Sequence, residues 1–66
     1  MNLLEITVRY LRKRVGRETP TFCLDSEFRR YGLSSGEAKE GIRQMMNHGV
    51  LYSPREGFVR LVPRYE

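Results

Sequence analysis

The chain is poor in the residues that hold small folds together through a disulfide or a metal. It contains one cysteine and one histidine. A single cysteine, Cys23, excludes an internal disulfide, which is consistent with a reducing compartment. One cysteine and one histidine also provide too few ligands for a structural zinc ion, so we expect no metal. We interpret Cys23 as a small buried hydrophobic residue between Phe22 and Leu24.

Long hydrophobic runs are absent as well. A membrane-spanning helix needs about 20 consecutive apolar residues, and no run in this chain approaches that length. Near the N-terminus, Glu5, Arg9 and Arg12 interrupt the apolar residues that a secretory signal would require. There is no low-complexity segment and no internal repeat. These absences predict one soluble domain over residues 1–66 with no membrane contact. We expect it to be cytoplasmic, or nucleoid-associated if it binds DNA.

The sequence also lacks a set of catalytic side chains. Acid–base or nucleophilic catalysis needs several titratable groups that converge in a pocket. The single histidine, the single cysteine and scattered carboxylates do not suggest such a set, and there is no glycine-rich phosphate loop. We therefore expect a binding protein without a cofactor, not an enzyme.

Basic charge, by contrast, is present in excess. Twelve lysine and arginine residues against eight acidic residues give a net charge of +4. A positive potential favours polyanionic partners such as nucleic acids. Because small domains also carry such a balance for solubility, the charge by itself leaves both interpretations open.

The most informative stretch begins at Ser34. Ser34 and Glu37 have the S-x-x-E spacing of a capping box, in which the two side chains satisfy free amides at a helix start. Gly49 suits the left-handed conformation that ends a helix, and His48 suits the last turn. We therefore predict a helix over residues 34–48. Its helical spacing predicts a buried stripe of Ala38, Ile42, Met45 and Met46.

This helix leads into a predicted β-hairpin. Residues 50–52 and 58–62 are short β-prone runs on either side of a turn segment. In that segment Pro54 presets its φ angle and Gly57 permits a positive φ. We expect Tyr52 and Phe58 to be cross-strand or core aromatic residues.

The residues before Ser34 are expected to pack against this unit. Helical spacing predicts a first helix over residues 2–15, capped by Asn2, and residues 16–20 break it. A β-prone run follows at residues 21–24. Asp25 is expected to cap a second helix over residues 26–31, which Gly32 ends. The expected apolar positions are Leu4, Val8, Leu11 and Val15, flanked by Leu3, Ile6 and Tyr10, in the first helix, and Leu24, Phe28, Tyr31 and Leu33 around the second.

Two helices joined by a short turn containing Gly32 form a helix-turn-helix. The expected order is helix, strand, helix, helix and hairpin, with the strand paired to the hairpin in a small antiparallel sheet. The sequence therefore predicts an α+β fold, the winged helix-turn-helix, with three helices and the hairpin as its wing.

The run MNHGVLYSPREGFVRLV, residues 46–62, resembles the end of the winged-helix domain that closes archaeal minichromosome maintenance (MCM) replicative helicases. In that family a helix ends in glycine, an apolar pair and Tyr or Phe lead to a wing turn with proline and glycine, and a strand returns. The matching positions here are Gly49, Tyr52, Pro54 and Gly57. The order and length of the elements extend the resemblance over nearly the whole chain. It implies a domain that regulates a helicase and its contacts, so a helicase core or another replication or transcription protein is an expected partner.

In a winged helix the second helix of the turn motif enters the major groove, and the wing follows the backbone. Arg43, Gln44 and Asn47 carry donors suited to purine edges, whereas Glu37 and Glu40 repel phosphate. Basic residues of the other helices and the wing are then expected to provide much of the affinity. The same side chains also fit a solvated helix face. The candidate nucleic-acid-binding residues are Arg29, Arg30, Ser35, Lys39, Arg43, Gln44, Asn47, Arg55 and Arg60.

These patterns predict a DNA-associated domain that binds duplex DNA largely through phosphate contacts, as a regulatory domain of a replicative helicase or as a small DNA-binding regulator. The alternative is a protein interaction module with little DNA affinity. Many regulators of this fold dimerise through an added helix. Because this chain shows none beyond the first helix, a monomer is the simpler expectation.

Overall fold

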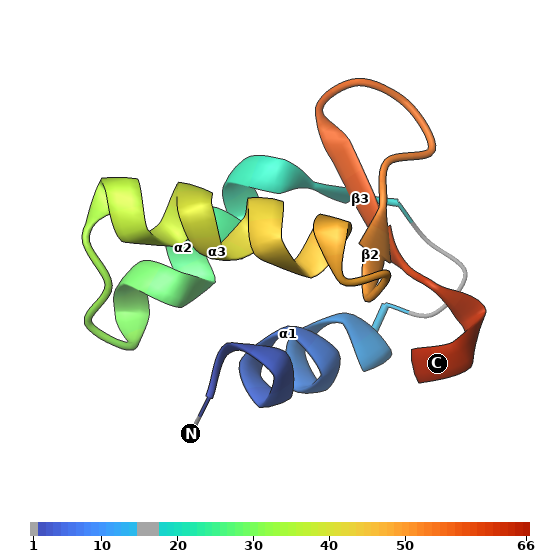
Figure 1. Cartoon of the computed structure of the whole chain (residues 1–66), viewed down its shortest axis with the longest axis horizontal. Helices are drawn as coiled ribbons and strands as arrows, with labels where there is room; N and C mark the ends of the chain where they lie inside the picture. Colours follow the sequence, from blue (N-terminus) through green and yellow to red (C-terminus); the bar gives the residue numbers. More distant parts are fainter. Residues whose placement is uncertain (1, 15–17) are drawn as a thin grey trace.

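A computed structural model describes residues 2–14 and 18–66 (Figure 1). The elements in chain order are α1 (Leu3–Arg12), β1 (Thr19–Pro20), α2 (Thr21–Arg30), α3 (Ser35–Asn47), β2 (Leu51–Tyr52), β3 (Phe58–Leu61) and the 3-10 helix η1 (Pro63–Tyr65). The strands form an antiparallel sheet in the order β1-β3-β2. This is the expected winged helix-turn-helix, in which α2 and α3 form the turn motif and the β2–β3 hairpin forms the wing. Within the described residues, no helix is long and apolar enough to cross a membrane.

One hydrophobic core joins the three helices to the sheet. Leu24 and Phe28 of α2 and Val59 of β3 are 0% exposed. Burying a large apolar side chain stabilises a fold by roughly 1.5–3 kcal/mol. Because a domain of this size has few such residues, each of them matters. The other buried apolar residues are Ile6, Leu11, Ala38, Ile42, Met45, Val50, Leu51 and Leu61.

The boundaries of α3 confirm the prediction. Ser34 Oγ accepts a hydrogen bond from Glu37 N at 3.2 Å, and Glu37 Oε1 accepts one from Ser34 N at 2.9 Å, which completes the capping box. His48 is the C-cap residue, and Gly49 follows with φ at +75°. Ala38, Ile42 and Met45 are buried as predicted, and Met46 is partly buried and packs against the core. Local signals at both ends therefore define α3.

The start of α2 contradicts the prediction. Residues 21–24, expected to be a strand, form the first turn of α2, and the strand is Thr19–Pro20 instead. The β propensity of a four-residue run is overruled because helical spacing brings Leu24 and Phe28 onto one buried face. Thr21 N donates to Gly57 O of the wing at 2.9 Å. The wing thus satisfies an amide at the start of α2 that has no side-chain cap.

The predicted role of Asp25 as a helix cap is also wrong. Asp25 lies in the middle of α2, where its carboxylate accepts hydrogen bonds from Arg29 one turn later. An earlier start leaves the cap position to Pro20. The end of the helix agrees with the prediction, because Gly32 follows it with φ at +98°.

The first helix begins as predicted and ends earlier. The side-chain oxygen of Asn2 accepts a hydrogen bond from Glu5 N at 2.8 Å, which caps α1. The helix ends at Arg12, whereas the prediction extended it to residue 15. Val15 and the two residues after it lie outside the described residues.

The buried side of α1 is rotated from the predicted stripe. Ile6 and Leu11 are buried and Thr7 is fully covered, but Leu4, expected in the stripe, is 39% exposed. Because α1 packs against both α2 and β3, the position of these partners decides which side of the helix is covered. Val8 is half-buried and remains with Leu4 at the outer surface.

Cys23 in α2 and Tyr31 directly after this helix are also more exposed than predicted. Cys23 is half-buried instead of lying in the core, and the neighbouring Phe22 is 70% exposed. Tyr31, expected to face inward, is 48% exposed. For Phe22 and Cys23 this follows from the early start of α2, which turns Leu24 toward the core and these two residues away from it, whereas Tyr31 lies beyond the last helical residue as the C-cap.

The wing forms as predicted. Tyr52 lies opposite Arg60 in the β2–β3 pair, and Pro20 lies opposite Phe58 in the β1–β3 pair. Since side chains alternate along a strand, Val59 faces the core while Phe58 and Arg60 face outward. Tyr52 and Phe58 are therefore cross-strand residues on the outer face of the sheet.

Candidate nucleic-acid interface

The side of α3 opposite the core carries four of the nine residues predicted to bind DNA. Ala38, Ile42 and Met45 point into the core. With about 3.6 residues per turn, the opposite side is a single exposed surface, which we call the α3 face. It consists of Gly36, Lys39, Glu40, Arg43, Gln44 and Asn47, all of them exposed.

Glu40 lies in the middle of the α3 face and binds two of the predicted residues. Glu40 Oε1 accepts a hydrogen bond from Arg43 Nε at 3.0 Å, and Oε2 accepts from Arg43 Nη2 and, at 3.4 Å, from Gln44 Nε2. The hydrogen bond from Arg43 holds the pKa of Glu40 below its ordinary value and raises the pKa of Arg43. The pair is therefore ionised at neutral pH, and Arg43 is engaged within its own helix.

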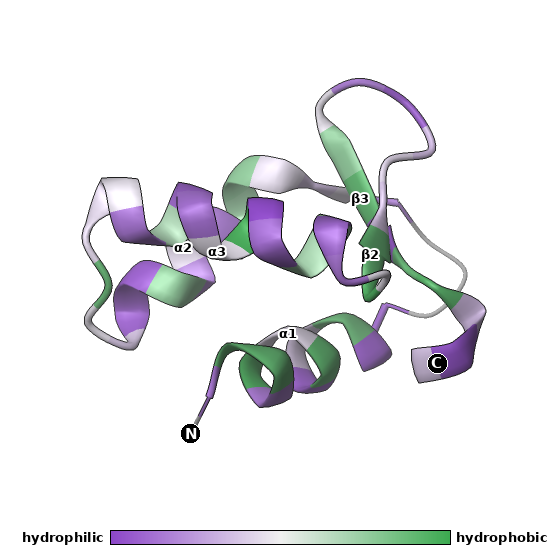
Figure 2. Ribbon diagram, viewed as in Figure 1, coloured by the Kyte–Doolittle hydropathy of each residue, from purple (hydrophilic) through white to green (hydrophobic). Residues whose placement is uncertain are grey.

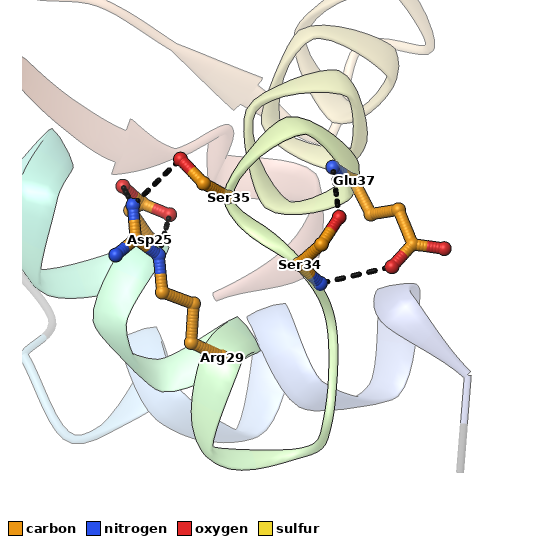
Figure 3. A network of polar contacts seen from close by, with 5 residues as sticks. All are labelled: Asp25, Arg29, Ser34, Ser35 and Glu37. Atoms are coloured by element: carbon orange, nitrogen blue, oxygen red, sulfur yellow. Dashed lines mark hydrogen bonds and ion pairs between the residues drawn. The ribbon is translucent and has the colours of Figure 1, made fainter.

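A polar network joins the end of α2 to the start of α3 (Figure 3). Arg29 Nε and Nη2 donate to the two carboxylate oxygens of Asp25 at 3.2 Å, and Nη2 also donates to Ser35 Oγ at 2.9 Å. Beside it, the capping box of Ser34 and Glu37 holds the first turn of α3, and the hydrogen bond from the Ser34 backbone lowers the pKa of Glu37. Arg29 and Ser35 thus lie together and connect the two helices of the turn motif.

Arg55 lies in the loop of the wing, as the sequence indicated. Its Nε donates to Glu18 Oε2 at 2.5 Å, and its guanidinium carbon lies 4.0 Å from the centroid of the Phe58 ring. The side chain of Arg55 is still 63% exposed. The ion pair and the cation–π contact therefore orient Arg55 on the outer face of the wing without burying it.

The remaining two arginines of the predicted set are paired as well. Arg30 Nη1 donates to Glu27 Oε1 at 3.1 Å. Arg60 Nη2 lies 3.9 Å from Glu66 Oε2, and Arg60 Nε is buried without a hydrogen-bond partner among the described residues. The side chain of Arg30 is 78% exposed, and ion pairs at such positions contribute only about 0–1 kcal/mol, so a phosphate group can compete for this cation. Arg60 is only 30% exposed and is less accessible.

Lys39 and Asn47 differ from these arginines. Both are exposed on the α3 face, and neither forms a side-chain hydrogen bond or ion pair with another residue of 2–14 or 18–66. Lys39 is therefore the cation of α3 that needs no rearrangement to reach a phosphate.

Comparisons with known proteins identify no relative. No family model matches the chain, and neither a curated protein nor a solved structure matches it. Its function is therefore inferred from the fold and from the surfaces described above.

Eight of the nine predicted residues fall into three groups. Lys39, Arg43, Gln44 and Asn47 share the α3 face, Arg29 and Ser35 form the joint of the turn motif, and Arg55 and Arg60 belong to the wing. Arg30 is separate, on α2. The spacing of Glu40 and Arg43, three residues apart on a helix, already signals their pairing. No sequence signal links Glu18 to Arg55, because the pairing of β1 with β3 brings them together.

Proposed function

We propose that this chain is a DNA-associated winged-helix domain that binds duplex DNA mainly through phosphate contacts. The strongest support is the exposed α3 face on the second helix of a helix-turn-helix. It combines the donor groups of Gln44 and Asn47 with Lys39, which has no ion-pair partner within residues 2–14 and 18–66. In this fold that helix enters the major groove and the wing lies along the backbone. The net charge of +4 supports attraction to a polyanion.

The ion pairs around the α3 face set the expected strength of binding. Only Nε of Arg55 binds Glu18, and only Nε and Nη2 of Arg43 bind Glu40, so each guanidinium keeps further N–H donors for a phosphate. Contact through the whole guanidinium requires the phosphate to displace Glu40 or Glu18. Both exchanges cost little because the pairs are exposed, but Glu40 remains on the surface and repels the backbone. We therefore expect modest affinity, low sequence selectivity and a steep dependence on salt.

The resemblance of residues 46–62 to the MCM winged-helix domain supports a more specific role as a regulatory domain of a replicative helicase. A DNA-binding domain of this kind could instead serve as a small DNA-binding regulator. A second candidate is a protein interaction module. It is favoured by the pairing of all five arginines of the predicted set with carboxylates, which reduces their availability for DNA.

The test is the binding of a labelled duplex of arbitrary sequence, followed by fluorescence anisotropy at low and physiological salt. Lys39→Ala is expected to weaken binding about three- to tenfold and to lower the salt slope by about 1, because one phosphate contact is lost. Glu40→Gln is expected to tighten binding by a similar factor, because it releases Arg43 and removes a repelling charge.

Glu5→Gln on α1 is the matched control for Glu40→Gln. It changes the net charge equally, and α1 lies on the opposite side of the molecule from the wing loop (Figure 1). If Glu5→Gln tightens binding as much as Glu40→Gln, the α3 face is not the binding surface. If the unaltered chain does not bind duplex DNA even at low salt, the DNA proposal is wrong and the protein interaction module remains.

A further inference from the structure

The outer side of α1 carries an apolar groove. Leu4 is 39% exposed, and Val8 and Tyr65 are half-buried beside it. In Figure 2 the ribbon of α1 is coloured as hydrophobic over much of its length. The groove has a volume of about 560 Å³. It is lined by Leu4, Glu5, Val8, Arg9, Arg12 and Tyr65, which we call the α1 groove.

One wall of the α1 groove is held in place by a hydrogen bond. Arg12 Nε donates to the backbone oxygen of Tyr65 at 3.1 Å, which fixes η1 against the last turn of α1. The other guanidinium nitrogens of Arg12 form no hydrogen bond with the described residues, and they lie at the C-terminal end of the groove. The groove is thus a defined surface with a cation at one end.

The charges along the α1 groove have a definite order. Glu5 lies toward the N-terminal end of the helix, and Arg9 and Arg12 lie toward its C-terminal end. No ion pair joins Glu5 or Arg9 to any residue of 2–14 or 18–66. Most carboxylates elsewhere are engaged, namely those of Glu18, Asp25, Glu27, Glu37, Glu40 and Glu66. An unengaged carboxylate beside an apolar strip is therefore unusual in this molecule.

We infer that the α1 groove is a self-association site, in which α1 of a second copy packs antiparallel to α1 of the first. With a two-fold axis beside Val8, position 5 of each helix lies opposite position 12 of the other. Glu5 of each copy then pairs with Arg12 of the other, and the Leu4 and Val8 side chains of both copies form one apolar strip. The antiparallel arrangement also aligns the two helix dipoles favourably.

The order of charges favours a second copy over other occupants. An acidic amphipathic helix would pair with Arg12 but would place a carboxylate against Glu5. Reversing α1 provides a cation opposite Glu5 and an anion opposite Arg12 at the same time. Arg9 lies near the axis, where its stem covers Val8 and its guanidinium can reach Glu5, one turn earlier on its own helix.

The expectation of a monomer was based on the lack of an added helix, whereas here α1 itself supplies the surface. Because the apolar strip is small, the association is expected to be weak, with a dissociation constant between about micromolar and millimolar. The wing loop lies on the other side of the molecule from α1 (Figure 1), so the contact leaves it uncovered. The inference does not depend on DNA binding.

The test is sedimentation velocity of the full chain from micromolar to millimolar concentration. The unaltered chain is expected to sediment faster as its concentration rises. Glu5→Arg and Arg12→Glu should each weaken association at least about tenfold, because two ion pairs per dimer become two like-charge contacts. An equimolar mixture of the two variants should associate again. In the mixture the new arginine faces the new glutamate, and Arg12 of one chain faces Glu5 of the other.

Glu56→Arg in the wing loop is the control, since it changes the net charge as Glu5→Arg does. A chain that stays monomeric at millimolar concentration overturns the inference. So does a Glu56→Arg variant that weakens association as much as Glu5→Arg, or a mixture that does not associate. If the chain is monomeric and binds an acidic amphipathic peptide in the α1 groove, the groove has another occupant and the inference is also overturned. Glu5→Arg leaves the bond between Arg12 and Tyr65 intact, so it remains decisive if circular dichroism shows Arg12→Glu to be unfolded.

Discussion

The two helices of the turn motif begin in opposite ways. α3 starts with a capping box formed by residues only three positions apart, Ser34 and Glu37. α2 starts after Pro20 with no side-chain cap, and its first amide, Thr21 N, binds Gly57 O in the wing. A helix start can be predicted when the groups that satisfy its free amides are near in sequence. When those groups come from another element, as the wing does for α2, the helix start cannot be predicted from the local sequence.

The largest expected effect tests the dependence of α2 on tertiary packing. Phe28 is completely buried, and replacing such a residue by alanine costs about 3–5 kcal/mol, close to the whole stability of so small a domain. We expect Phe28→Ala to be unfolded at room temperature by circular dichroism. Phe22→Ala, the same change in the same helix at a residue that is 70% exposed, should stay within about 0.5 kcal/mol of the unaltered chain. Equal losses would show that Phe28 does not anchor α2.

A second test asks whether tertiary contacts also constrain α3. A Cβ atom at Gly41 would lie 2.8 Å from Leu3 Cδ1 and 3.3 Å from Phe28 Cε2, whereas one at Gly36 would meet nothing within 4 Å. Gly41→Ala is expected to destabilise by about 1–2 kcal/mol, because overpacking outweighs the gain in helix propensity. Gly36→Ala should instead stabilise by up to about 1 kcal/mol. Urea denaturation measures both. Stabilisation by both variants would mean that Leu3 moves aside freely.

The helix starts themselves can be compared directly. Ser34→Ala removes the cap of α3 and should cost about 1 kcal/mol in the free energy of unfolding. Thr21→Ala keeps the amide that binds Gly57, so a change below about 0.5 kcal/mol is expected. Urea denaturation gives the stabilities, and hydrogen exchange of the Glu37 amide reports the first turn of α3. If Thr21→Ala costs as much as Ser34→Ala, a side chain contributes to the start of α2 after all.

The smallest expected effect is the pH dependence of α3. The pKa of Glu37 is lowered by the hydrogen bond from the Ser34 backbone, and the pKa of Glu40 by the hydrogen bond from Arg43. A lowered folded-state pKa contributes stability that is present above the unfolded-state value and is lost as the pH falls through the folded-state value. We therefore expect stability to decline as the pH drops below 4.5, the ordinary glutamate value.

Replacing both Glu37 and Glu40 by glutamine should reduce this decline. The measurement is urea denaturation over a pH series from neutral to acid, for the unaltered chain and the double variant. Parallel curves for the two proteins would show that other carboxylates account for the loss.

For the candidate site, the helical period predicted where the residues of α3 lie, although not whether they bind DNA. Lys39, Arg43 and Asn47 share the α3 face because they are four residues apart. Their availability for a phosphate did not follow from the period, since Arg43 is engaged by Glu40 and Lys39 is not. In the wing, Arg55 was placed correctly in the loop, but its contacts with Glu18 and Phe58 depend on strand pairing.

The sequence by itself determined the elements with local signals: the caps at Asn2 and Ser34, the helix ends at Gly32 and Gly49, and the wing hairpin. These signals act within a few residues, and together they specify a winged helix-turn-helix. Only the tertiary structure decided the start of α2, the buried side of α1 and the partners of the arginines in the wing. The reason is that burial and ion pairing join residues distant in sequence, such as Glu18 and Arg55, and no local pattern encodes where those residues meet.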